Sequence, residues 1–157
     1  MRKIEINKIN NEQDLEDLKQ LFREYVGFLQ VNLDFQDFEN ELLKLPAKYA
    51  EPEGAIFLAK INDLPVGCIA LWKLEDGVCE MKRLFVKTEF QGLGIGKMLA
   101  NRLMEEAKLK GYRTMKLDTL RRLQSANYLY SLLGFSETQA YNFNPEPDIV
   151  YFEKALV

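Results

Sequence analysis

The chain has 157 residues, 47% of them hydrophobic and 29% charged, a composition that predicts one soluble domain over residues 1–157. Its net charge of −3, without any Lys- or Arg-rich run, argues against a nucleic-acid binder. The sequence contains no His, which excludes a His-based triad and a His-ligated metal, so we expect no metal site. It also shows no signal-peptide core and no apolar run of membrane-spanning length, so we expect a cytoplasmic protein that does not bind membranes.

Hydrophobic periodicity and turn residues predict eleven elements. The helical pattern that starts at Asn11 has a capping residue there, and Gly111 is suited to end the third helix. Gln30 to Asp34 is expected to break the first helical pattern, and 48–54 to form a loop. The expected elements, in order, are a strand over 3–9, helices over 11–28 and 35–45, strands over 55–61, 66–72 and 78–86, a helix over 94–110, a strand over 112–118, a helix over 125–133, and strands over 135–141 and 148–154.

This order, βααβββαβαββ, predicts an α/β (α+β) fold with a mixed, mostly antiparallel central sheet and four flanking helices. The three strands between 55 and 86 are joined by short turns at Asn62-Asp63 and Glu75-Asp76-Gly77, and should form an antiparallel meander. The strand over 112–118 follows a strand–helix unit and should lie parallel to 78–86. Cys68 and Cys79 fall in apolar strands, where we expect buried free thiols.

A glycine-rich turn lies between the long strand and the third helix. Gly92, Gly94 and Gly96 alternate where that helix should begin, and a helix start offers free N–H groups and a positive dipole end to an anion. The dinucleotide motif G-x-G-x-x-G fails because its third glycine would be Lys97, and the P-loop motif fails because Met98 follows Gly96-Lys97. What remains is Q-x-x-G-x-G, a candidate phosphate site; the alternative is an ordinary turn without ligand.

At this point the chain resembles the GNAT superfamily of acetyl-CoA-dependent N-acetyltransferases. Three features carry the resemblance: Arg83-Leu84-Phe85-Val86 running into the Q-x-x-G-x-G loop, the amphipathic helix and strand that follow, and Leu129 to Phe135, which matches L-Y-x-x-x-G-F. The likeness extends over nearly the whole chain. It implies the fold predicted above with a splayed parallel strand pair, and acetyl-CoA as co-substrate.

The resemblance also implies a set of cofactor-binding residues. The loop would hold the CoA pyrophosphate on backbone N–H groups, and the main chain of the long strand would pair with the pantetheine amides as an added strand does. Lys97 would add charge near the phosphates, or else be a solvated helix lysine. The family often has Asn seven residues before the tyrosine of L-Y-x-x-x-G-F; Leu123 stands there, and Asn127 is expected to supply the polar contact instead. The implied residues are Leu84, Phe85, Val86, Gln91, Gly92, Leu93, Gly94, Ile95, Gly96, Lys97 and Asn127.

Two residues match the family's catalytic positions. Tyr130 would be the general acid that reprotonates the CoA thiolate, since a phenol with a pKa of about 10 carries a proton at neutral pH. The alternative is a core tyrosine packed beside Phe135. Glu80 would be the general base, often acting through water; the alternative is an exposed or ion-paired strand residue, with Lys82 as partner.

The resemblance therefore predicts transfer of an acetyl group from acetyl-CoA to a primary amine of a small molecule or peptide, by direct attack in a ternary complex. The alternative is an acyl-CoA sensor or partner-binding module of the same fold. The acceptor would lie between 25–38 and 141–148, where acidic residues (Asp34, Asp37, Glu146, Asp148) would attract a cation and Arg121 and Arg122 would meet a carboxylate or the CoA phosphates. The oligomeric state is left open, a homodimer included.

Overall fold

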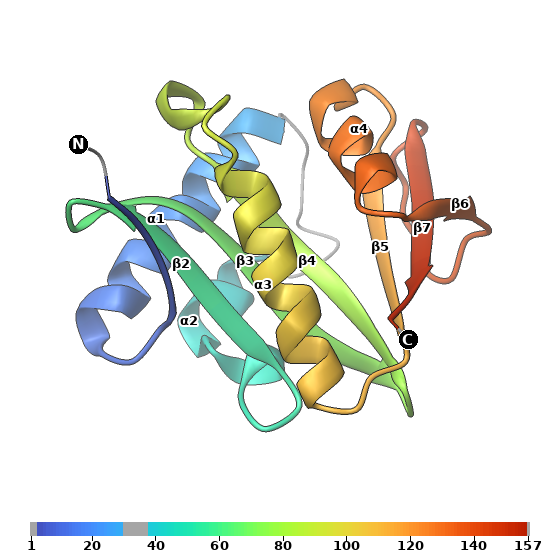
Figure 1. The fold of residues 1–157 in the computed structure, drawn as a ribbon, viewed down its shortest axis with the longest axis horizontal. Coiled ribbons are helices and arrows are strands. Elements are labelled where there is room, and N and C mark those ends of the chain that lie inside the picture. Colours follow the sequence, from blue (N-terminus) through green and yellow to red (C-terminus); the bar gives the residue numbers. More distant parts are fainter. Residues whose placement is uncertain (1–2, 30–37, 157) are drawn as a thin grey trace.

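The computed structural model describes residues 3–29 and 38–156, which form four α-helices and a seven-stranded sheet (Figure 1). Among these residues no helix is both long and apolar enough to cross a bilayer. The elements are β1 (Ile4–Lys8), α1 (Glu12–Leu29), α2 (Phe38–Lys44), β2 (Ala55–Ile61), β3 (Leu64–Glu75), β4 (Val78–Val86), α3 (Ile95–Leu109), β5 (Thr114–Leu120), α4 (Gln124–Leu132), β6 (Ser136–Thr138) and β7 (Ile149–Ala155), with short 3₁₀ turns at Ala47–Tyr49 and Thr88–Phe90.

The described strands lie in the order β1-β2-β3-β4-β5-β7-β6. Every neighbouring pair is antiparallel except β4 and β5, which are parallel. That parallel ladder holds only three residue pairs, from Val78–Thr114 to Glu80–Lys116, and the two strands then separate, as Figure 1 shows. The predicted mixed sheet, meander and splayed parallel pair are confirmed.

The sheet carries an apolar layer on each face. On one face α1 and α2 pack Leu18, Phe22 and Leu42 against β2 and β3. On the other, α3 packs Ile95, Leu99, Leu103 and Ala107, and α4 adds Tyr130. Figure 1 shows α3 and α4 on the face of the sheet opposite to α1 and α2. Helices thus cover both faces of the sheet. We therefore expect a ligand-binding cavity where β4 and β5 separate.

The residues predicted to start α1 and to end α3 do so in the structure. The backbone N–H of Asp14 donates to the Asn11 side chain at 2.8 Å, and the N–H of Asn10 donates back to Asp14, so both residues cap α1. At the far end of α3, Gly111 follows the last turn with a φ of +91°, the left-handed conformation that terminates helices.

Several predicted boundaries are wrong. The predicted strand over 135–141 shortens to β6, because its last pair joins Thr138 to Tyr151 and the chain then leaves the sheet toward a loop with Pro145 and Pro147, which have no N–H to donate. The predicted strand over 112–118 shifts to β5, which continues to pair with β7 as far as Leu120–Ile149. β3 runs longer than 66–72 because its pairing extends to the turn at each end, through Leu64–Ile61 and Glu75–Val78. The predicted loop over 48–54 begins inside a 3₁₀ turn.

The second predicted helix is present as α2, and its residues 35–37 lie outside the described residues. The predicted break over 30–34 and the acidic residues Asp34 and Asp37 lie outside them as well.

Candidate active site

A β-bulge distorts β4 just beyond the point where this strand separates from β5. Phe85 pairs with Cys68 and Lys82 pairs with Ala70, so two β4 residues, Arg83 and Leu84, oppose Ile69 alone. Arg83 takes a φ of +59° there, and its guanidinium donates to both oxygens of Glu41 on α2 at 3.0 and 3.1 Å. Beyond Glu80 the ladder gives β4 no partner on β5, so one backbone edge of Leu84 to Val86 is not paired within the sheet.

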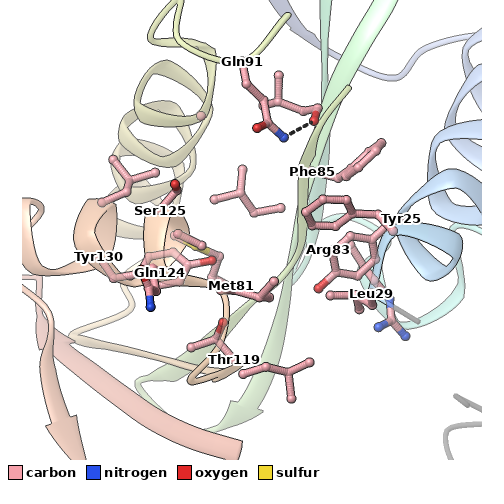
Figure 2. A pocket seen from close by; sticks show the side chains of 18 of the residues that line it. Tyr25, Leu29, Met81, Arg83, Phe85, Gln91, Thr119, Gln124, Ser125 and Tyr130 are labelled. Carbon is pink, nitrogen blue, oxygen red and sulfur yellow. Dashed lines mark hydrogen bonds between the residues drawn. The ribbon is translucent and has the colours of Figure 1, made fainter. Parts of the chain in front are cut away.

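A cavity of about 750 Å³ opens along this edge (Figure 2). It extends from the glycine turn, past β4, to side chains of α1, β5 and α4. Most of the predicted cofactor-binding residues line it: Leu84, Phe85, Val86, Gln91, Gly92, Gly94, Ile95, Gly96 and Lys97. The structure therefore gathers in one space the strand edge and the turn that the sequence places side by side.

The glycine turn presents the N-terminus of α3 to this cavity. Gly94 is the N-cap, with a left-handed φ of +82°, and no side chain caps the helix. The first intrahelical bond runs from the Met98 N–H to the Gly94 carbonyl, so the N–H groups of Ile95, Gly96 and Lys97 have no acceptor in the helix. Gln91 donates its side-chain amide to the Val86 carbonyl at 3.2 Å, which ties the turn to the end of β4 (Figure 2). An anion would meet free donors and the positive dipole end here.

Leu93 and Asn127 lie outside the cavity lining. The Leu93 side chain is 43% exposed at the tip of the turn. The amide nitrogen of Asn127 donates to the Leu120 and Arg121 carbonyls at 3.1 and 3.3 Å, and its oxygen is buried without a hydrogen-bond partner in the described structure. Asn127 thus holds the β5–α4 connection.

Tyr130 combines both interpretations that the sequence leaves open. Its ring is 7% exposed and packs against Phe135 and Phe152 with centroids 6.0 and 6.1 Å away. It also lines the cavity, opposite Tyr25 of α1 in Figure 2. Burial, with a smaller contribution from Tyr25 and Asp118, raises the pKa of the Tyr130 hydroxyl above its ordinary value. Tyr128, two residues earlier, is 57% exposed and points elsewhere.

Glu80 is buried beside the cavity and is absent from its lining. Its side chain is 1% exposed, and one carboxylate oxygen accepts from the Trp72 indole N–H while the other accepts from the Tyr141 hydroxyl. The Lys82 ammonium lies 3.9 Å from the first oxygen and does line the cavity. The ion pair with Lys82 is therefore present, inside the protein instead of on its surface.

Three polar side chains near this point were missed by sequence reasoning. Tyr141, predicted to end a strand, lies in the β6–β7 loop and reaches Glu80 from 61 residues away, a contact that no local pattern indicates. Asp118 lines the cavity from β5, and Tyr25 lines it from α1. A signal for Asp118 existed: in the strand Met115 and Leu117 point into one apolar layer, which puts Asp118 on the opposite face.

The remaining candidates have structural partners. Arg122 lines the cavity, but it donates to Asp148 at 2.8 Å and to the Leu29 carbonyl at 3.0 Å. Arg121 pairs with Glu137 at 2.8 Å. Cys68 and Cys79 are buried free thiols, as predicted, and burial raises the pKa of both. No cluster of three or more Cys, Asp or Glu suited to a metal occurs among residues 3–29 and 38–156.

Comparisons with known proteins agree with this geometry. Residues 15–135 match the model of the acetyltransferase (GNAT) family. An uncharacterised N-acetyltransferase of Schizosaccharomyces pombe is 37% identical over 150 residues, which cover 94% of this chain and 92% of that protein. An uncharacterised N-acetyltransferase of Dictyostelium discoideum is 30% identical, with 90% and 94% covered.

Solved structures share the fold. A GNAT-family acetyltransferase from Staphylococcus aureus Mu50 superposes with a TM-score of 0.82 at 24% identity, covering 99% of this chain and all of that one. The PaiA N-acetyltransferase of Thermoplasma acidophilum, solved in complex with coenzyme A, gives 0.73 at 22% identity, with 98% and 99% covered. The Salmonella typhimurium acetyltransferase YncA, solved with acetyl-CoA, gives 0.75 at 20% identity, with 99% and 95% covered.

Proposed function

Because this chain belongs to the GNAT family of acetyltransferases and is an acyltransferase, we propose that it transfers the acetyl group of acetyl-CoA to a primary amine of a small molecule or peptide in a ternary complex. The single observation that carries the proposal is the continuity of one cavity, from the open edge of β4 to the free N–H groups of α3. A ligand that carries amides at one end and phosphates at the other complements this arrangement. Acetyl-CoA has both.

Each part of the cavity has a proposed task. The N–H groups of Gly94, Ile95 and Gly96 bind the pyrophosphate, assisted by the charge of Lys97. The free edge of Leu84 to Val86 pairs with the pantetheine amides, as an added strand would. A β4 N–H near Leu84 then donates to the thioester carbonyl and stabilises the negative charge that develops on its oxygen.

Tyr130 is the proposed general acid. Its hydroxyl faces the cavity from the α4 side, and no hydrogen bond occupies it within the described part of the chain. Because burial raises its pKa, the phenol keeps its proton at neutral pH and can donate it to the leaving sulfur.

The acceptor amine must lose a proton before it attacks. For a lysine-like amine with a pKa of about 10.4 this costs about 4–5 kcal/mol at pH 7, and for an α-amine with a pKa of about 8 only about 1 kcal/mol. A base is thus important for the first kind of acceptor and nearly dispensable for the second. Glu80, the base expected from the sequence, does not line the cavity, and of its side-chain partners only Lys82 does, so any proton that it accepts from an acceptor amine must be relayed to it.

The test is an acceptor panel with acetyl-CoA, in which free CoA thiol is measured against protein-free controls. The panel contains α-amino acids, polyamines, arylalkylamines and lysine peptides, and alcohols as non-amine competitors. We expect amine-dependent thiol release for at least one amine class. Binding of acetyl-CoA without release for any amine would instead favour the acyl-CoA sensor, and release with alcohols alone would make the enzyme an O-acyltransferase.

A further inference from the structure

We propose that Asp118, and not Glu80, is the carboxylate that receives the acceptor ammonium and takes its proton. This inference rests on the proposed amine acetylation. It replaces the base expected from family resemblance with a residue chosen by its place in this cavity.

Asp118 lies where β5 has already separated from β4. The last pair of the parallel ladder joins Glu80 to Lys116, so Asp118 is the next β5 residue on that face, two positions beyond the ladder. Its antiparallel partner on β7 is Tyr151. The side chain is partly exposed and lines the cavity, whereas the Glu80 side chain is 1% exposed and does not. Of the two carboxylates, only Asp118 is open to a bound molecule.

The hydrogen bonds of Glu80 and Asp118 also indicate that Asp118 is the more available of the two carboxylates. Both oxygens of Glu80 accept from side chains, Trp72 on one and Tyr141 on the other, and Lys82 adds its charge at 3.9 Å. Asp118 accepts from Asn142 through Oδ2 at 2.9 Å, and the described residues offer no donor to Oδ1. Both oxygens of Glu80 are therefore engaged by side-chain donors, whereas Oδ1 of Asp118 is open to an ammonium.

Four tyrosine hydroxyls lie close enough to Asp118 to feel its charge, and two of these tyrosines, Tyr25 and Tyr130, line the cavity with it. Next to burial, its negative charge is among the causes that raise the pKa of Tyr25 on α1, Tyr130 on α4, Tyr141 in the β6–β7 loop and Tyr151 on β7. For Tyr25 the pKa rises to about 12. Asp118 thus sits among four neutral hydroxyls, one of them the proposed acid.

The charged side chains that share the cavity with Asp118 come from β4, α3, the β5–α4 connection and the β6–β7 loop. They are Lys82, Arg83, Lys97, Arg122 and Glu146. Lys82 is paired with Glu80, Arg83 with Glu41, and Arg122 with Asp148, while Lys97 lies in the first turn of α3. On β5 itself, the Lys116 ammonium lies 5.3 Å from the centre of the Tyr141 ring. The charge of Asp118 is therefore available to a cationic acceptor.

The reaction step balances as follows. The ammonium gives one proton to Oδ1 of Asp118, and the freed nitrogen lone pair forms the C–N bond with the thioester carbon while the C–S bond breaks. The leaving sulfur takes the proton of the Tyr130 hydroxyl. The second proton that nitrogen loses returns to the Tyr130 oxygen, and Asp118 releases its proton to solvent, so that one proton is released per acetyl group transferred.

The experiment compares Asp118→Asn, Asp118→Glu and Glu80→Gln with wild type, as kcat/KM from pH 5.5 to 10 with the best amine of the panel. Asp118→Asn should lower kcat/KM at pH 7 by about 10²–10³, with the KM for acetyl-CoA kept. Its rate should then recover about tenfold per pH unit, as the amine loses its own proton in solution. Asp118→Glu should restore part of the rate and the wild-type pH dependence.

Glu80→Gln should lose less than about tenfold and keep the wild-type pH profile. It should also shift the fluorescence of Trp72, the only tryptophan of the chain, because the indole loses a carboxylate acceptor. A fully exposed carboxylate, Asp76, provides the matched control as Asp76→Asn. Wild-type kinetics in Asp118→Asn, or a Glu80→Gln enzyme that shows the pH recovery expected of Asp118→Asn, would overturn the assignment.

A binding titration separates this inference from the proposed function. The panel amines are titrated into the CoA complexes of wild type and Asp118→Asn, and we expect at least about tenfold weaker binding by the variant, because the ammonium loses a charged partner. Amine binding without turnover by wild type would reject the proposed function and leave Asp118 as the ammonium site. Equal amine affinity for both proteins, or none for wild type, would overturn the inference.

The Asp118→Asn variant should fold, because its side-chain amide oxygen can still accept the hydrogen bond that Asn142 donates to the wild-type carboxylate. If Asp118→Asn does not fold, the kinetics and amine affinity of Asp118→Glu are compared with those of wild type instead.

Discussion

Tyr130 shows how a single side chain can belong both to the core and to the lining of the candidate active site. Its ring fills space between Phe135 and Phe152, so its position is set by packing and tolerates little movement. Its hydroxyl remains at the cavity surface. The apolar surroundings that hold the ring also raise the pKa of the hydroxyl, so the same burial positions the proposed acid and keeps it protonated.

Tyr130→Phe should therefore separate chemistry from folding. Phenylalanine keeps the ring and its packing, so we expect the melting temperature to stay nearly unchanged. The leaving thiolate loses its proton donor, so kcat should fall by about 10²–10⁴ while the affinity for CoA is nearly kept. Steady-state kinetics and CoA titration measure both quantities. Unchanged turnover would remove Tyr130 from the acid role.

At this scale the sequence predicts the residues that follow one another along the chain better than those that meet in space. Gln91, Gly94 and Gly96 lie within one turn, where their spacing locates them, and Tyr130 lies within a segment that is located by its resemblance to the family motif. The hydrogen bond of Tyr141 to Glu80 and the place of Asp118 in the cavity depend on how far β4 and β5 separate. That separation is a property of the sheet and leaves no mark in the neighbouring residues.

At the scale of the element, the N-terminus of α3 lacks a side-chain cap, as the proposed anion site requires. Gly94, the N-cap, has no side chain with which to cap the helix, and its left-handed φ of +82° disfavours any residue that has one, so the first N–H groups stay free. Gly96 lies inside the helix with an ordinary helical φ, and a Cβ added there would meet a Leu129 methyl at 3.5 Å, an ordinary contact. Glycine at position 96 thus lowers the stability of α3, although an alanine would fit there.

Gly96→Ala tests this directly. Alanine in a compatible helical position should raise stability by about 0.4–1 kcal/mol. Its methyl group would keep a phosphate from the free N–H groups, and loss of one charged hydrogen bond of about 1.5–3 kcal/mol weakens binding at least about tenfold. We expect a higher melting temperature without ligand and a smaller rise on adding acetyl-CoA.

Gly111→Ala is the matched control, since Gly111 also adjoins α3 but has a φ of +91° and lies outside the cavity lining. The left-handed conformation costs alanine about 1–2 kcal/mol, so the melting temperature should fall while the acetyl-CoA effect remains. The phosphate role of the turn would be wrong if the two variants responded to acetyl-CoA alike.

Element type was predictable because periodicity and turn residues agree along most of the chain; β2 and β4 have the predicted bounds. The errors fall where pairing partners decide. β6 is short because β7 stops pairing with it beyond Thr138, although its sequence continues to look like a strand. β5 extends past Asp118 because β7 continues alongside as far as Ile149.

At the scale of the whole molecule, the two apolar layers contain several Tyr hydroxyls and Cys thiols whose pKa is raised by burial. Burial raises the pKa of Tyr25 and Cys79 to about 12, and it also raises the pKa of Tyr49, Tyr130 and Cys68. The unfolded chain releases these protons near the ordinary values of about 8.5 for Cys and about 10 for Tyr. Above those values the unfolded state binds fewer protons than the folded state, so raising the pH favours unfolding.

Stability should therefore be level up to about pH 8 and fall increasingly steeply above about pH 9, with each group that ionises only on unfolding contributing up to about 1.4 kcal/mol per pH unit. Urea unfolding midpoints between pH 7 and 11 measure this, with the m-value checked for constancy. A midpoint that stays level to pH 11 would show that these hydroxyls and thiols ionise as readily in the folded protein as in the unfolded chain.

The separation of β4 from β5 also bears on solubility. Unpaired strand edges are sites where another chain can add a strand and begin aggregation. The free edge of β4 faces inward, onto a cavity walled by side chains of α1, α3 and α4, and a bulge at Arg83 distorts it. The outer edges of the sheet are β1 and β6, strands of only five and three residues. The protein thus keeps backbone hydrogen-bonding groups open to a narrow ligand while it withholds them from a neighbouring polypeptide.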